Sequence, residues 1–140
     1  MPNLLNRFLK AQQTDYFTAL SEIKSGQKRS HWMWYIFPQI AGLGFSETSK
    51  FYAIKNLEEA KEFLHHPILG MRLKEISNEL IKLDEANANK VFGSPDDLKL
   101  KSCMTLFSMV EDQPDNVFEK VLNKFFNGKP DNRTIDLVKV

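Results

Sequence analysis

Apolar residues recur at helical spacing along most of this chain. The longest stripe steps by four and three residues through Leu69, Leu73, Ile76, Leu80 and Leu83, while polar residues occupy the other faces. Comparable stripes occupy residues 4–9, 16–23, 57–64, 100–110 and 117–125. No pair of segments alternates with the period of two that paired strands need. We therefore predict an all-α fold, a bundle of roughly six to eight helices.

Several residues are suited to helix ends. Asn3 is predicted to cap a first helix, and a second is expected over 15–25 unless the two form one longer unit. Asn56 and Glu59 have the spacing of a reciprocal cap. Pro67 suits the first turn of the longest helix, where its missing N–H has no helical partner. Residues 88–92 are expected to form only a short turn.

The length of 140 residues predicts one globular helical domain over 1–140, large enough to bury a core. Cys103 is the only cysteine, which excludes an intramolecular disulfide. No group of cysteines and histidines has the spacing of a zinc site. We therefore expect neither a metal nor a cofactor.

The composition also bounds the partners. Asn6, Arg7 and Lys10 interrupt the N-terminal apolar residues before a signal-peptide core can form, and no apolar run approaches the about 20 residues of a membrane span. The net charge of +1 is too small to indicate an obligatory nucleic-acid partner. We expect a cytoplasmic protein without a membrane partner, and no pattern identifies a protein partner.

Residues 30–39 contain both tryptophans and one of the three histidines. We predict a buried helix here that ends near Phe37, because the residue before Pro38 avoids helical geometry. So much aromatic surface suits either a core ridge or the wall of a polar-ligand pocket. His31 can exchange a proton near pH 7, although a histidine in an apolar segment is more often a core residue bonded to a backbone carbonyl. The loop 39–44 has two glycines, so its backbone can approach a ligand.

A second candidate region is the predicted helix start at 94–99. A capping Ser94 and two acids, Asp96 and Asp97, are what helix stability alone would select. The functional alternative makes either acid a general base or the acceptor of a ribose diol, with Lys99 on a phosphate. Arg29 belongs to a basic group beside the aromatic segment that suits an anion.

The chain resembles a bacterial family of domains of unknown function. The residues that carry this resemblance cover almost the whole chain: Phe8–Gln12, Lys28–Gln39, Gly42–Gly44, Tyr52–Ile54, His66–Gly70, Phe92–Leu100 and Met104–Phe107. The resemblance implies a small, mostly helical protein and no particular activity. Some members are called calpastatins, but a calpastatin acts through a disordered segment, whereas this chain has the periodic apolar faces of a folded protein.

A weaker resemblance links the chain to the NADAR family, which is associated with NAD and ADP-ribose metabolism and with cleavage of N-glycosidic bonds. Residues 30–33, 104–107 and 124–125 are similar to that family in order and rough spacing. Ser30 stands where the family has a glutamate, and its Trp-Gly-rich C-terminal motif is missing. The resemblance implies a catalytic role for His31 only.

Together these observations predict one pocket, walled by the aromatic segment and closed by the helix start at 94–99. The candidate catalytic residues are His31 and Asp97, and the candidate ligand-binding residues are Arg29, Trp32, Trp34, Gln39, Ser94, Asp96 and Lys99. The expected function is binding of a small polar, nucleotide-like ligand, related to ADP-ribose or NAD, with glycosidic hydrolysis as an optional activity. The alternative is a non-enzymatic interaction module whose aromatic residues form an exposed patch. Exposure of the indoles distinguishes the two.

Overall fold

The computed structural model describes residues 4–139, which form nine α-helices and no strand. The helices are α1 (Asn6–Lys24), α2 (Met33–Ile36), α3 (Glu47–Tyr52), α4 (Leu57–His65), α5 (Leu69–Lys82), α6 (Ala88–Phe92), α7 (Asp96–Ser108), α8 (Val117–Phe126) and α9 (Asn132–Val138). The all-α prediction is confirmed, but the expected number of helices is too low. The segment expected as a turn is helix α6, because the Asn87 side chain accepts hydrogen bonds from the N–H groups of Asn89 and Lys90.

The N-terminal stripe forms one helix of 19 residues, α1, rather than two. Its buried face runs without a break from Phe8 through Tyr16 to Ile23. The predicted cap at Asn3 lies outside the described residues. Continuous burial along one face stabilises the longer helix more than a second start near Asp15 would.

The starts of α4 and α5 can be compared with the residues predicted to begin them. Asn56 accepts a hydrogen bond from Glu59 N at 2.9 Å, which confirms one half of the predicted reciprocal cap. The Glu59 carboxylate accepts from Lys55 N at 2.9 Å and not from Asn56 N. Pro67 lies two residues before the start of α5 at Leu69 and is therefore outside its first turn. The first N–H groups there are taken by His66, whose Nδ1 accepts from Ile68 N and Leu69 N.

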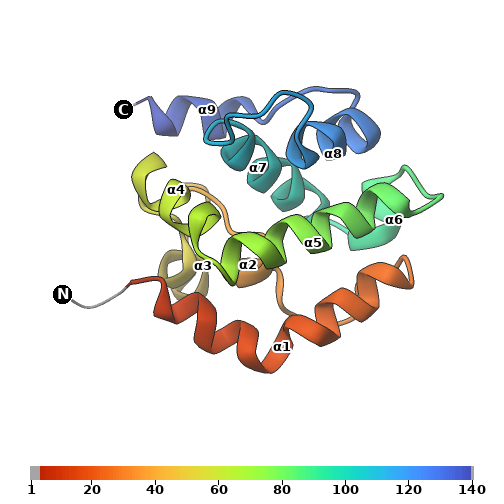
Figure 1. Cartoon of the computed structure of the whole chain (residues 1–140), viewed down its shortest axis with the longest axis horizontal. Helices are drawn as coiled ribbons and strands as arrows, with labels where there is room; N and C mark the ends of the chain where they lie inside the picture. The colour runs from red at the N-terminus through yellow and green to blue at the C-terminus, as the bar shows by residue number, and fades with distance from the viewer. Residues whose placement is uncertain (1–3, 140) are drawn as a thin grey trace.

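Helix α5 lies between α1 and α8, and α7 packs against both α4 and α8 (Figure 1). A chain of fully buried rings connects four of these helices. Phe8 of α1 meets Phe63 of α4, which meets Phe107 of α7, which meets Phe118 of α8, with centroid separations of 5.0, 5.4 and 5.8 Å. Within residues 4–139, no helix has the length and apolar character needed to cross a bilayer.

The crossing of α4 and α5 depends on Gly70. A Cβ atom built on Gly70 would lie 1.8 Å from the carbonyl oxygen of Leu64. That oxygen belongs to the backbone of α4, so it cannot move aside without shifting the whole helix. Only glycine lets the two backbones come this close.

Gly70→Ala should therefore destabilise the fold even though alanine favours helices. We expect the free energy of unfolding to fall by about 2 kcal/mol or more, because overpacking outweighs the gain in helix propensity. Urea denaturation followed by circular dichroism measures this change. The control is Met71→Ala on the exposed side of the same helix. A Gly70→Ala protein as stable as this control would contradict the packing argument.

Candidate functional site

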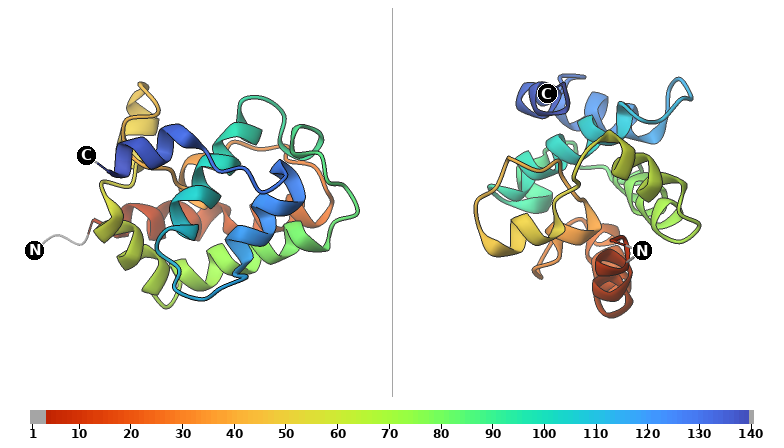
Figure 2. Two further views of the ribbon diagram at one scale, coloured as in Figure 1. Left: turned by 90° about the horizontal axis from the view of Figure 1, so that it is seen from above. Right: turned by 90° about the vertical axis from the view of Figure 1, so that its left-hand side faces the viewer.

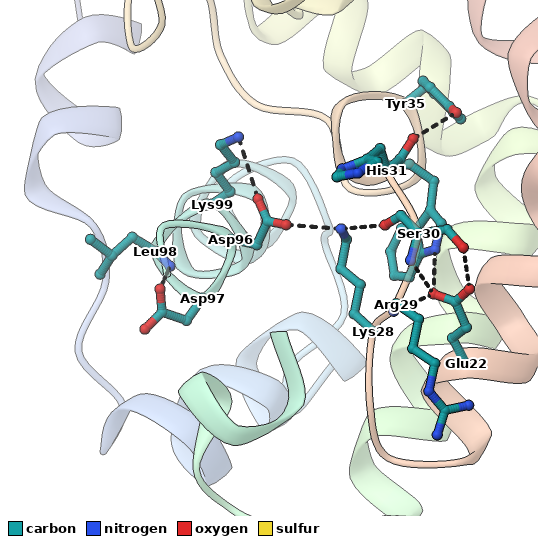
Figure 3. A network of polar contacts seen from close by, with 11 residues as sticks. Glu22, Lys28, Arg29, Ser30, His31, Tyr35, Asp96, Asp97, Leu98 and Lys99 are labelled. Carbon is teal, nitrogen blue, oxygen red and sulfur yellow. Dashed lines mark hydrogen bonds and ion pairs between the residues drawn. The ribbon is translucent and has the colours of Figure 1, made fainter. Parts of the chain in front are cut away.

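The end of α1 carries a buried carboxylate, Glu22, that organises the segment after it. Its Oε1 accepts hydrogen bonds from Arg29 N at 2.7 Å, Ser30 N at 2.9 Å and Trp32 Nε1 at 2.9 Å. Its Oε2 accepts a further bond from Ser30 Oγ (Figure 3). Two backbone groups and one indole are thus held by a single side chain.

These hydrogen bonds determine the positions of the two tryptophan side chains. The Trp32 indole is held against Glu22 and is only 1% exposed, packed in the core beside Phe37. Helix α2 begins at the next residue, and Trp34 is half-buried and faces a cleft. The buried helix predicted for this segment is confirmed, although it has only four residues.

The hydrogen bonds also set the charge of Glu22. Burial by itself raises the pKa of this carboxyl, but the bonds donated by Ser30, Arg29 and Trp32 outweigh burial and lower the pKa to about 2. Glu22 is therefore ionised throughout the physiological range of pH.

A row of charges connects this segment to the start of α7. Lys28 Nζ lies 2.9 Å from Asp96 Oδ2 and 5.0 Å from the Trp32 ring centroid. The other oxygen of Asp96 lies 3.4 Å from Lys99 Nζ. Lys99 Nζ in turn lies 4.9 Å from the ring centroid of Trp34. Figure 3 shows this row running from Lys99 through Asp96 to Lys28.

A cleft of about 430 Å³ opens between the loop 39–44, helix α3 and the start of α7. Trp34 and Tyr52 contribute aromatic rings to its wall, and Gln39 contributes an amide. The loop approaches α3 closely, since a Cβ on Gly44 would lie 2.5 Å from Ser49 Oγ. Helix α9 runs beside the same loop (Figure 2), where Arg133 Nη2 lies 3.4 Å from the carbonyl oxygen of Gly42.

The charge on the cleft wall has one sign. Lys50 of α3 and Lys99 of α7 both line it. In the part of the chain that the structure describes, no aspartate, glutamate, histidine or cysteine lines it. The charged residues that line the cleft are therefore both cations, and its lining has no carboxylate or imidazole to exchange protons.

Three of the residues singled out from the sequence line this cleft: Trp34, Gln39 and Lys99. Trp32 does not, because it is in the core. Arg29 has an exposed side chain and contributes its backbone N–H to Glu22.

The remaining predicted residues lie elsewhere. His31 is exposed, and the Tyr35 hydroxyl donates to its carbonyl oxygen at 3.2 Å. Asp97 points away from His31 (Figure 3) and accepts a hydrogen bond of 3.4 Å from Asn89. Asp97 borders a second, shallow depression on that side. The structure therefore does not bring the two candidate catalytic residues to one pocket.

The expected role of Ser94 in starting a helix is wrong. Helix α7 begins at Asp96 after Pro95, and no side chain caps it. Ser94 is exposed, and the N–H group of Asp97, the second residue of α7, donates to Gly93 O at 2.9 Å. Asp96 forms ion pairs with Lys28 and Lys99 and does not line the cleft.

Sequence reasoning missed two parts of the site. Lys50 and Tyr52 were not considered, although the double-glycine loop leads directly into the helix that carries them. Glu22 was missed too. The signal for it was a polar residue on the apolar face of α1, where Gln12 is also buried.

Comparison with known protein families identifies the family of this chain. A family model described as a protein of unknown function, DUF1810, matches residues 2–138. The chain belongs to this family. The crystal structure of the conserved hypothetical protein Rv1873 from Mycobacterium tuberculosis resembles this DUF1810 chain with a TM-score of 0.94 and 42% identity, over 97% of this chain and 96% of that one.

The resemblance to a family of domains of unknown function is thus confirmed. No curated protein matches this DUF1810 chain. The resemblance to the NADAR family receives no support from either match.

The buried carboxylate of this DUF1810 protein predicts a specific dependence of stability on pH. The pKa of Glu22 is lower in the folded than in the unfolded chain, so Glu22 stabilises the fold above about pH 4.5 and loses that effect as pH falls toward 2. Glu22→Gln should lower the free energy of unfolding at pH 7 by about 2–3 kcal/mol, and the difference from the natural protein should shrink below pH 4.5.

Urea denaturation between pH 3 and pH 7 measures this difference. The charge-matched control is Glu62→Gln on an exposed position of α4. A difference between Glu22→Gln and the natural protein that stays constant over the whole range would contradict the assignment.

Proposed function

We propose that this protein binds a small, polar, nucleotide-like ligand in the cleft between the loop 39–44, α3 and α7. The observation that carries the proposal is the combination of two aromatic rings and two lysines on a wall without a carboxylate. A volume of about 430 Å³ is within the range of small-molecule sites.

The chemistry of the wall supports a ligand with a flat ring and an anionic group. Trp34 and Tyr52 offer aromatic surface to a base or nicotinamide ring. The amide of Gln39 can both donate to and accept from the edge of such a ring. Lys50 and Lys99 supply positive charge for phosphate. ADP-ribose and NAD-related compounds combine these groups.

We propose binding without hydrolysis of a glycosidic bond. Such hydrolysis needs an acid that protonates the leaving group and a carboxylate that either stabilises the sugar cation or activates the attacking water. His31 and Asp97 were the candidates, and neither lines the cleft.

The alternative of an interaction module loses its main support. It required the aromatic residues of the segment to form a flat exposed patch, whereas Trp32 is buried and Trp34 belongs to a cleft wall. One buried indole and one indole on a cleft wall favour a small ligand over an exposed patch.

Titration calorimetry with AMP, ADP-ribose and NAD tests the proposal. We expect at least one of the three to bind. Lys50→Gln and Trp34→Leu should each weaken that binding by about tenfold, which corresponds to a loss of about 1.4 kcal/mol.

Two variants serve as controls. Lys61→Gln removes the same charge at an exposed position of α4, and His31→Ala removes a ring that does not line the cleft. Both should bind as the natural protein does. Equal loss in Lys50→Gln and Lys61→Gln, or no binding of any of the three compounds, would contradict the proposal.

A further inference from the structure

Lys99 makes two contacts at the edge of the cleft. Its ammonium lies 3.4 Å from Asp96 Oδ1 and 4.9 Å from the centroid of the Trp34 ring. Both Lys99 and Trp34 line the cleft, but Asp96 does not. An anion that binds to Lys99 in the cleft therefore meets the negative charge of Asp96 at the same ammonium group.

We infer, on the basis of the proposed function, that the phosphate of the ligand takes Lys99 over from Asp96, so that Asp96 is an internal competitor that sets the affinity of the cleft for anions. This assigns Asp96 a role opposite to that of a ligand-binding residue. It also specifies the class of ligand: a phosphorylated compound binds, and a neutral nucleoside binds weakly, because it has no group that replaces the carboxylate.

The two lysines that flank Asp96 differ in a way that makes this exchange easy. The Lys28 side chain is 7% exposed, 2.9 Å from Asp96, and also hydrogen-bonded to the carbonyl oxygen of Ser30. The Lys99 side chain is 25% exposed, and its distance to Asp96 is longer. A partly exposed ion pair of this kind contributes little. When Lys99 turns to a ligand, Asp96 keeps its buried partner and is not left as an unpaired charge.

The cleft offers the phosphate a second cation. Lys50 lines it from α3, whereas Lys99 lines it from α7. Lys50 is exposed, and no ion pair involving it is found among the described residues. The ligand therefore competes with an internal carboxylate at one lysine only.

Calorimetric titrations with pyrophosphate, AMP and adenosine test this inference in Asp96→Asn and in its matched control Asp97→Asn. Both variants remove one negative charge at the start of α7, but only Asp96 contacts Lys99. We expect Asp96→Asn to bind pyrophosphate and AMP about two- to fivefold more tightly than the natural protein, the range that a partly exposed ion pair allows. Asp97→Asn should change binding less, and adenosine should bind weakly to all three proteins.

A double variant separates competition for Lys99 from a general change of charge. In a Lys99→Met background, Asp96→Asn should no longer improve binding of pyrophosphate. Thermal unfolding without ligand shows whether each variant is folded at the temperature of the titration. Lys28→Met leaves Lys99 as the single ion-pair partner of Asp96, so this variant should bind pyrophosphate more weakly.

The outcomes separate this inference from the proposed function. If Asp96→Asn binds pyrophosphate more tightly than the natural protein, but AMP binds no more tightly than pyrophosphate, the competition is supported and the nucleotide-like ligand is overturned. Unchanged or weaker binding in Asp96→Asn, or an equal gain in Asp97→Asn, overturns the competition while leaving AMP binding in place. If neither anion binds to any of the proteins, both ideas are wrong.

Discussion

The carboxylate of Glu22 is the constraint on which the site depends. It is buried and charged, a combination that is costly unless every lone pair is used. Here the segment after α1 supplies the donors, from Arg29, Ser30 and the indole of Trp32. The same hydrogen bonds thus solvate the charge of Glu22 and hold the segment in place. Losing it would release the chain just before the residues that wall the cleft.

From that anchor the remaining geometry follows in steps. With Trp32 fixed in the core, the single turn of α2 directs Trp34 to the other side, where Lys99 lies over its ring. Lys28 then joins the segment to Asp96 at the start of α7. Glu22 thus fixes the segment that follows α1, and Asp96 joins this segment to the start of α7, which is distant in sequence. The cleft forms beside this junction.

Local patterns predicted the fold better than the site. The stripe of α5 and the cap at Asn56 depend on spacings within one or two turns, so they can be recognised in a sequence. The roles of the two tryptophans cannot, because α2 is too short to show a period. Which indole is buried is decided by Glu22, ten residues before Trp32. Likewise, the first turn of α7 was expected to face a ligand with its acids, whereas Asp96 pairs with lysines.

The two tryptophans have different surroundings: Trp32 is a core residue held by Glu22, and Trp34 is part of the cleft wall. Because the chain has only these two, their indole N–H groups give two resonances in an ¹H–¹⁵N spectrum. When AMP is added, we predict that the Trp34 resonance shifts progressively while that of Trp32 stays in place. An unmoved Trp34 resonance, or a Trp32 resonance that shifts as much, would contradict it.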